Sequence, residues 1–343
     1  MNLTLLTSQF SQIGQTLITF ILVMSALAGS LGLVNVVSKR AVAIPQARWI
    51  FLAINLLFVV GFGLICWLHI RIYLTLPLEL PGQMVPWLNQ EIGAMNSKAA
   101  YAFPLFDPSH PPRYIIPLWV ENEKYYFWFM CYGVMAFLAF RRTTRHRLQG
   151  VLLVFMAIQS AILFMAANPF QKPLPKFFGE IGPWFSGSFS PMQQFGEFMK
   201  IYPKMIFYYN TPYMWLHPPM LFLSYSAITI TFITSVFMLV KRDPEIETLG
   251  YDCAKFGYFM LTLGMLLGYP WALQAWGPNW WWDPKICSSI MMWAIYSTYL
   301  HTRLYANKKS MWYFTSGLGI LCFVAMVFTF VSSFYFPGEH TFQ

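Results

Sequence analysis

Four of the fourteen tryptophans stand within seven positions of one another, between two apolar runs of the sequence. They belong to the segment Trp276-Gly-Pro-Asn-Trp280-Trp281-Trp282-Asp283-Pro284. Indole rings favour the membrane interface, so a lone tryptophan in such a place usually belongs to an aromatic belt. Four rings beside a Gly-Pro break can also form a flat apolar platform, on which a planar ligand such as a porphyrin gains stacking and buried area. The segment is therefore a candidate ligand platform.

Asp283 and Pro284, which end this segment, also fit the start of a helix. Proline is tolerated in a first helical turn, and an aspartate before it accepts hydrogen bonds from backbone N–H groups that lack partners inside the helix. We predict that Asp283 caps the helix that follows. Its position beside the tryptophans makes it a candidate for the ligand site as well.

Histidine supplies the second chemical signal, because iron in a planar macrocycle takes one or two imidazole ligands. His217 begins an apolar run as Leu-His-Pro-Pro, and His340 follows the last apolar run. We expect Pro218 and Pro219 in the first turn of that helix, with the His217 ring held at the membrane surface. Two axial ligands over a tryptophan platform are then geometrically allowed, although spacing alone favours unrelated interfacial histidines.

The other histidines differ in their expected depth. His301 stands about 15 residues into its apolar run, roughly 22 Å from the outer end by helix rise. An ionisable side chain at that depth indicates function, unless it is a neutral ring bonded to a neighbouring helix. His69 is expected near the outer surface, about 20 Å from the depth of His301, so these two should not ligate one iron. His110 is an ambiguous surface residue, and His146 is expected in a solvated basic loop.

The chain that must position these residues is 57% hydrophobic and only 10% charged, which is too apolar for a water-soluble core of 343 residues. It predicts an all-α, polytopic integral membrane protein. Runs of about 20 apolar residues cross a hydrocarbon layer about 30 Å thick. We predict eight transmembrane spans, at 16–38, 49–70, 125–140, 150–167, 217–240, 254–274, 286–304 and 311–335.

The basic residues predict the orientation of these spans. The short connections of one set hold thirteen basic and four acidic residues, which accounts for the whole formal charge of +9. Because short basic loops stay in the cytoplasm, both termini are expected on the outer, periplasmic side. The long connections 71–124 and 168–216 and the Trp-rich loop 275–285 then share the outer face. We expect the whole chain, 1–343, to form one transmembrane domain with its core at 125–343.

Several other classes of function are disfavoured. The basic residues lie between apolar runs, so the positive charge does not predict a nucleic-acid partner. The five cysteines form no CxxC or CxxCH motif, which argues against a zinc site, a disulfide framework and a covalently attached haem. Cys287 lies close to the Trp-rich loop, and without a second cysteine nearby an inert thiol is the favoured interpretation.

Together these residues resemble the haem-handling proteins of cytochrome c maturation, whose signature is a tryptophan-rich outer loop of the form WGxxWxWDP. Within that family the chain is most similar to the N-terminal half of CcmF-type haem lyase subunits, with CcsA-type synthetases as a related branch. The resemblance covers most of 125–343 and, more loosely, the first two spans. Besides the tryptophan segment it rests on Asn168-Pro169-Phe170, Leu174-Pro175, His217 to Tyr225, Leu300-His301 and Phe330 to His340.

The resemblance implies that His217 and His340 are the axial ligands of a non-covalently bound b-type haem, presented at the outer face. It implies that His301 helps to hold a second, intramembrane b-type haem. In the CcsA-type branch, His69 would match an early intramembrane histidine, although our depth estimate argues against its facing His301. The presented haem is expected beside the outer loop residues Trp276, Trp280, Trp281, Trp282 and Asp283.

Partners and location follow from the same resemblance. Such proteins receive haem from a donor and bind apocytochrome c, and the thiols of its CxxCH motif form thioethers with the haem vinyl groups. This chain is then expected to act as a component of a cytochrome c haem lyase complex. The expected location is the bacterial inner membrane or an equivalent energy-transducing membrane, with the functional face periplasmic.

Two departures from the family pattern leave alternatives open. Lys285 follows the Asp-Pro, where family members usually carry an acidic residue or Glu-Asn. CcmF-type proteins also continue well beyond the position of His340, so either a separate membrane subunit supplies the missing part or the deep haem is absent. Two other functions fit the same residues: a haem-bearing electron-transfer subunit of a respiratory complex, and a haem exporter.

Overall fold

The computed structural model describes residues 3–75, 80, 82–97, 104–111, 113, 115–186, 190–204, 212–305 and 308–337. All regular elements longer than a single bridge in those residues are helices. Every one of the eight predicted apolar runs lies within or largely within a long helix, so the all-α prediction is confirmed.

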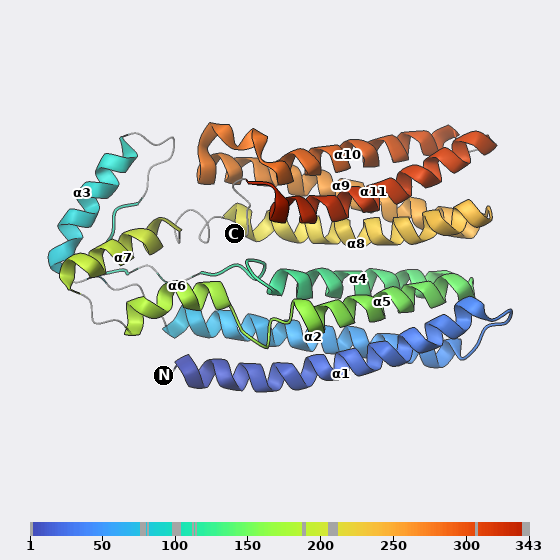
Figure 1. Cartoon of the computed structure of the whole chain (residues 1–343), viewed down its shortest axis with the longest axis horizontal. Helices are drawn as coiled ribbons and strands as arrows, with labels where there is room; N and C mark the ends of the chain where they lie inside the picture. Colours follow the sequence, from blue (N-terminus) through green and yellow to red (C-terminus); the bar gives the residue numbers. More distant parts are fainter. Residues whose placement is uncertain are drawn as a thin grey trace.

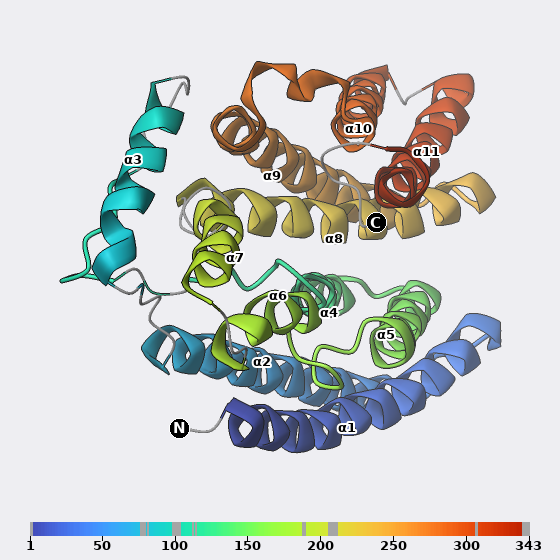
Figure 2. The same cartoon turned by 60° about the vertical axis from the view of Figure 1, so that its left-hand side comes forward.

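The eight long helices form two groups that lie side by side (Figures 1 and 2). The first group consists of α1 (Leu3–Val37), α2 (Ile44–Thr75), α4 (Glu123–Arg142) and α5 (His146–Ala166). The second group consists of α8 (Pro212–Val240), α9 (Pro244–Trp276), α10 (Pro284–Thr302) and α11 (Lys309–Tyr335). Helix α8 joins the groups by packing against α4 and α5.

Six of these helices, α1, α2, α5, α8, α9 and α11, are long and apolar enough to cross a membrane. Helices α4 and α10 lie alongside them in Figure 1, with 20 and 19 residues respectively. The chain is therefore a helical bundle with six candidate membrane spans among the described residues.

The connections divide between the two ends of the bundle. Short connections join α1 to α2, α4 to α5, α8 to α9 and α10 to α11 at one end, here called the short-loop end (Figure 1). The other end, here called the long-loop end, carries most of the remaining elements. These are η1 (Gly82–Met84), α3 (Val85–Asn96), α6 (Pro175–Ser186), α7 (Pro191–Lys204) and η3 (Gly277–Trp282).

A stripe of glycines on α9 allows α8 to approach closely. A Cβ added at Gly257 would lie 2.7 Å from the Cβ of Ala227, and one added at Gly264 would lie 2.7 Å from Cδ2 of Leu221. Small residues at such spacing let helix backbones pack tightly inside membranes. The stripe continues to Gly268, which faces the His217 ring.

The paired prolines of α8 lie deeper in the helix than the sequence suggested. We expected Pro218 and Pro219 in the first turn, but α8 begins at Pro212, so they fall in its second turn. A proline there cannot donate to the carbonyl four residues earlier. The Met214 carbonyl, which Pro218 leaves without that donor, accepts a hydrogen bond from Nε1 of Trp119 at 2.5 Å. Trp119 therefore compensates for the proline and ties the segment before α4 to α8.

The two groups are also joined at the short-loop end. The Glu245 carboxylate accepts hydrogen bonds from the Thr143 hydroxyl at 2.7 Å and from the backbone N–H and hydroxyl of Thr144. Arg145 pairs with Asp243 at 2.7 Å. The turn between α4 and α5 is thus fastened to the start of α9.

Candidate functional site

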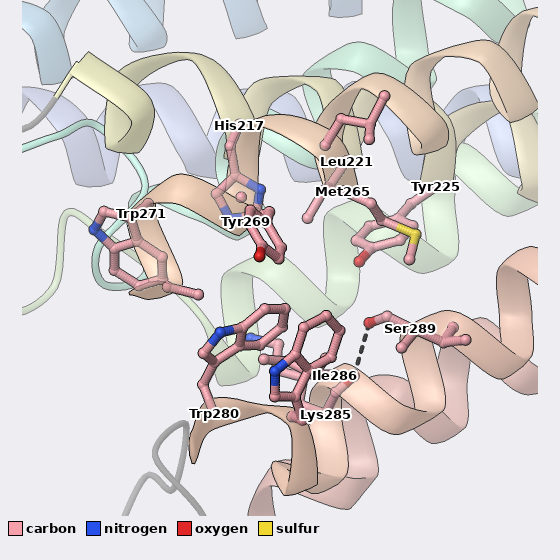
Figure 3. A pocket seen from close by; sticks show the side chains of 15 residues that line it. His217, Leu221, Tyr225, Met265, Tyr269, Trp271, Trp280, Lys285, Ile286 and Ser289 are labelled. Carbon is pink, nitrogen blue, oxygen red and sulfur yellow. Dashed lines mark hydrogen bonds between the residues drawn. The ribbon is translucent and has the colours of Figure 1, made fainter. Parts of the chain in front are cut away.

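A pocket of about 340 Å³ lies near the long-loop end of the second group, between α8, α9, η3 and α10 (Figure 3). Its wall is mostly aliphatic and aromatic, with a few polar side chains. The residues that matter for its chemistry are His217, Tyr225, Tyr269, Trp271, Trp280, Trp281, Lys285 and Ser289. Several lining side chains, including Leu266, Tyr269 and Ile290, are exposed on the outside of the bundle, so the pocket opens sideways.

The ring of His217, a residue of α8, is held against α9 by a contact with a backbone carbonyl and by stacking on an indole. Its Nδ1 is 2.9 Å from the carbonyl oxygen of Gly264, which orients the ring. The ring stacks on Trp271 with centroids 6.0 Å apart and planes inclined by 23°. A Cβ at Gly268 would lie 2.9 Å from Nδ1, so glycine leaves the space that the imidazole occupies. With Nδ1 directed at a carbonyl, Nε2 is the nitrogen suited to a metal.

The Trp-rich loop supplies the opposite wall of the pocket. Trp280 is buried, with 7% of its surface exposed, and stacks on Trp281 with ring centroids 4.2 Å apart. Tyr269 of α9 meets both indoles edge to face. Figure 3 shows Trp280 facing His217 and Tyr269 across the pocket. Trp282 is 86% exposed and does not line the pocket. Of the neighbouring rings of Trp280, Trp281 and Trp282, only the first two therefore form the pocket wall.

Asp283 caps α10, as predicted. Its Oδ1 accepts hydrogen bonds from the backbone N–H groups of Lys285 at 3.0 Å and Ile286 at 3.2 Å, and Pro284 occupies the first helical position. The capped turn holds Lys285 and Ile286 against the pocket. Asp283 itself is buried behind this turn and is absent from the pocket wall.

A second recess of about 190 Å³ adjoins the first on the side of α4 and α11. It shares His217, Leu221, Tyr225, Trp271 and Lys285 with the first pocket. Its further walls come from the segment before α4, from α4 itself and from α11, through Trp119, Lys124, Tyr125 and Phe330. His217 and Lys285 therefore stand where the two hollows meet.

Two of the predicted site residues fall outside this description. His340 lies outside the described residues, as does the side chain of Trp276. Phe330 brings α11 to the second recess seven residues before Pro337, the last described residue. The pairing of His217 with His340 thus stays a prediction.

The remaining histidines lie away from the pocket. His301 is exposed in the last turn of α10, with Nδ1 2.8 Å from the Ser297 carbonyl oxygen. His69 is buried in α2, with Nδ1 2.7 Å from the Ile116 carbonyl oxygen. Because α10 runs from the long-loop end to the short-loop end, His217 and His301 occupy different ends of the bundle (Figure 1).

His110 belongs to a compact surface turn. The Ser109 hydroxyl donates to the Asp107 carboxylate at 2.5 Å, and Nδ1 of His110 lies 3.0 Å from its other oxygen. The Ser109 hydrogen bond, followed by that of His110, lowers the pKa of the Asp107 carboxyl to about 2. His110 is exposed there and lines neither hollow.

All five cysteines are free. Cys287 is exposed, and its thiol donates to the Trp281 carbonyl at 3.3 Å. Within the described residues no cluster of three or more His, Cys, Asp or Glu side chains is placed to hold a bare metal ion.

The pocket suits a large planar ligand that carries a metal. Its volume falls within the range of about 300–1,000 Å³ that is usual for small-molecule sites, and its wall is aromatic with few polar groups. The single imidazole is held by a carbonyl, which is how protein ligands of metals are commonly oriented. The residues present therefore fit haem.

Several residues that shape the site were absent from the sequence prediction. Trp271 and the glycines at 264 and 268 place or flank the His217 ring, and Tyr269 packs against Trp280. The regular spacing of Gly250, Gly257 and Gly264 is a signal for close helix packing that could have located the partner helix of His217. Lys285 was noted only as a departure from a pattern.

Comparison with known proteins places this chain in one class, the proteins that assemble cytochromes c. The family model described as cytochrome C assembly protein matches residues 119–339, more than half of the chain. The chain belongs to this family. The resemblance inferred from the tryptophan segment is thereby confirmed.

Among its relatives, the cytochrome c biogenesis protein CcsA of Synechococcus sp. (strain RCC307) is 35% identical over 92 residues, which cover 25% of this chain and 30% of that protein. CcsA of Cyanidium caldarium is 42% identical over 84 residues, covering 23% and 28% respectively. A solved structure, the cytochrome c heme lyase CcmF, superposes with a TM-score of 0.62 at 16% identity. The match covers 96% of this chain and 47% of CcmF, so the chain spans about half of that structure, and the likeness concerns the fold alone.

Proposed function

We propose that this chain binds haem in the pocket at its long-loop end and presents it there for covalent attachment to apocytochrome c. The observation that carries the proposal is His217, a carbonyl-oriented imidazole that faces the buried indole of Trp280 across an apolar pocket. Membership of the cytochrome c assembly family supports the same conclusion.

In this proposal each group has a distinct task. His217 ligates the iron through Nε2, and His340 approaches from the segment after α11 as the second ligand. Trp280 and Trp281 support the macrocycle, with Trp276 and Trp282 of the same loop beside them, and Asp283 holds the turn that carries Lys285. Haem itself supplies the vinyl groups to which the thiols of a CxxCH motif add. The chain contributes orientation and exclusion of water.

The proposed setting is an energy-transducing membrane such as the bacterial inner membrane. We propose that α4 and α10 cross it together with the six more apolar helices, giving eight spans in a single domain over 1–343. The basic residues of the short-loop end support a cytoplasmic position for that end, which places the pocket and both termini on the periplasmic side.

A second, intramembrane haem at His301 belongs to the proposal only together with a partner. His301 is exposed on the described bundle, which leaves room for a ligand supplied by another subunit. We propose that a separate membrane subunit provides it. Apocytochrome c and a haem donor are the other proposed partners.

Complementation tests this function. Cells that lack their own copy of the gene are supplied with the wild-type chain or with His217→Ala, and covalent haem is stained in all c-type cytochromes after denaturing electrophoresis. We expect His217→Ala to abolish the stain generally, because every client needs the presented haem. His110→Ala, which alters an exposed histidine away from the pocket, is the matched control and should leave the stain unchanged.

The two alternatives give different results. Loss of one respiratory activity with normal holocytochromes c would identify an electron-transfer subunit and contradict the proposal. Haem that accumulates in the cytoplasm of the deletion strain, and is corrected by His217→Ala, would instead support export. Normal staining with His217→Ala would exclude this residue as the presenting ligand.

A further inference from the structure

Two lysines stand out in a site that is otherwise aromatic and aliphatic. Lys285 lines both hollows, and Lys124 lines the second recess. They come from opposite groups of helices, Lys124 from the first turn of α4 and Lys285 from the first turn of α10. Among the described residues, no carboxylate lines either hollow. The site therefore presents cationic groups next to an apolar cavity.

The nearby carboxylates are engaged in holding the backbone. Glu121 accepts hydrogen bonds from the backbone N–H groups of Lys176 and Phe177, at 3.1 and 2.9 Å, at the start of α6. Asp283 accepts those of Lys285 and Ile286 at the start of α10. The side chains of Lys285 and Lys124 line the hollows, whereas those of Glu121 and Asp283 do not.

We propose that Lys285, assisted by Lys124, binds the carboxylate side chains of the porphyrin and so fixes its rotation in the pocket. This inference rests on the proposed function, because it names how the same site holds its ligand. An aromatic pocket favours any flat apolar body, but it cannot fix the rotation of such a body about the His217–iron axis. Charged hydrogen bonds at one edge can, because the carboxylates of a porphyrin lie together on one side of the ring.

Lys285 is the main contact because it stands where the hollows meet, in a turn that is fixed by the Asp283 cap. Lys124 faces only the second recess and is the weaker contact. A lysine at the edge of an apolar pocket can donate charged hydrogen bonds to the acid groups of an apolar ring, whereas a neutral ring offers no carboxylate for that contact.

A metal-free ligand separates this role from iron ligation. The purified full-length protein is titrated with protoporphyrin IX and with its dimethyl ester at one detergent concentration, and binding is followed by quenching of tryptophan fluorescence. The readout is the ratio of variant to wild-type dissociation constants for each porphyrin, in which partition of the porphyrin into micelles cancels. We expect Lys285→Met to weaken binding of the diacid about tenfold and to leave the ester unchanged, the size expected for loss of a charged hydrogen bond.

Matched variants control for folding and for general charge. Lys285→Arg keeps the cation and should retain the preference for the diacid. Lys124→Met should lower the preference for the diacid less than Lys285→Met does. Lys172→Met removes an exposed lysine that lines neither hollow and should change nothing.

Each other outcome overturns the proposal in a recognisable way. Equal weakening of both porphyrins by Lys285→Met would mean that the side chain only shapes the pocket, and haem binding through His217 would stand. Unchanged binding of both would remove Lys285 from the site altogether. Failure of the wild-type protein to bind either porphyrin would overturn this inference alone, because a metal-free ring does not test haem binding through the bond from His217 to iron.

Discussion

The position of the His217 ring depends both on groups of α9 that contact it and on a glycine of α9 that leaves room for it. The Gly264 carbonyl orients the imidazole, Trp271 supports its face, and Gly268 leaves the space beside Nδ1 empty. The sequence predicted the histidine and the tryptophans because their chemistry is visible in a single residue. Gly268 could not be predicted in the same way, because it lies outside the regular spacing of Gly250, Gly257 and Gly264, and its missing side chain has meaning only once the opposing helix is known.

Gly268→Ala should therefore impair the site without harming the helix. Its Cβ would lie 2.9 Å from Nδ1 of His217, so the ring must shift. Alanine favours a helix over glycine by up to about 1 kcal/mol, so weaker binding could not come from loss of helix. We expect haem affinity, measured by absorption titration, to fall about tenfold, a cost near 1.4 kcal/mol.

Gly317→Ala is the control for that change. Gly317 lies on α11 with no heavy atom within 4 Å of its added Cβ. Its substitution should leave haem affinity unchanged. Equal losses in the two variants would show that the space beside His217 has no special part in binding.

The tryptophans of the outer loop should differ in their importance. Trp280 is buried against the pocket, whereas Trp282 is 86% exposed and lies outside its wall. Trp280→Leu removes a stacking surface worth about 1 kcal/mol beyond its buried area, so we expect haem affinity to fall about tenfold. Trp282→Leu should change it less than twofold in the same titration. The reverse order would place the ligand on the outside of the loop.

Among the helices, α8 illustrates where prediction from sequence ends. The apolar run marked its membrane part well, but the helix begins at Pro212, five residues before the predicted start at 217. A hydropathy profile detects the length of an apolar run, but it does not detect an aromatic first turn that extends the same helix. The start of α10 was predicted correctly, because Asp283 and Pro284 form a cap that can be recognised locally. Helices α3, α6 and α7 lie in connections that were predicted only as outer loops, because they are too short and too polar to form apolar runs.

The bond from Trp119 to the Met214 carbonyl should matter only because of Pro218. Trp119→Phe removes the donor and leaves that carbonyl unsatisfied, which should lower stability by about 1 kcal/mol. In a Pro218→Ala background the backbone N–H of residue 218 can donate instead, so the same change should cost less. Thermal unfolding in detergent of wild type, Trp119→Phe, Pro218→Ala and the double variant gives the coupling energy between the two residues. Equal losses of stability in both backgrounds would contradict the idea that Trp119 replaces the donor that Pro218 lacks.

Across the whole molecule, two helix groups are fastened at both ends while the site occupies one end. Composition and the placement of basic residues predicted the bundle and the gathering of the long connections at one end with the Trp-rich loop. The division into two groups was not predicted, because it depends on contacts between helices distant in sequence. Trp119 joins the groups at the long-loop end and Glu245 joins them at the short-loop end.

Glu245→Ala should therefore weaken the bundle without altering the pocket. It removes three hydrogen bonds to the turn at Thr143 and Thr144 and a contact with Arg145, in a partly exposed setting. We expect a loss of about 1–2 kcal/mol in stability, measured by thermal unfolding, with haem affinity unchanged. Glu197→Ala, which breaks an exposed pair with Lys200, should cost less than about 0.5 kcal/mol. A loss of haem affinity with Glu245→Ala would mean that the two ends are coupled.

The central claim is that the His217 imidazole ligates haem iron, and an absorption spectrum of the reconstituted full-length protein tests it most directly. The comparison uses wild type, His217→Gly, His217→Gly with added free imidazole, and His110→Ala as the control for a histidine outside the pocket. The account predicts that the histidine-ligated spectrum is lost in His217→Gly, returns when imidazole enters the vacated space, and persists in His110→Ala. An unchanged spectrum and affinity in His217→Gly would contradict it.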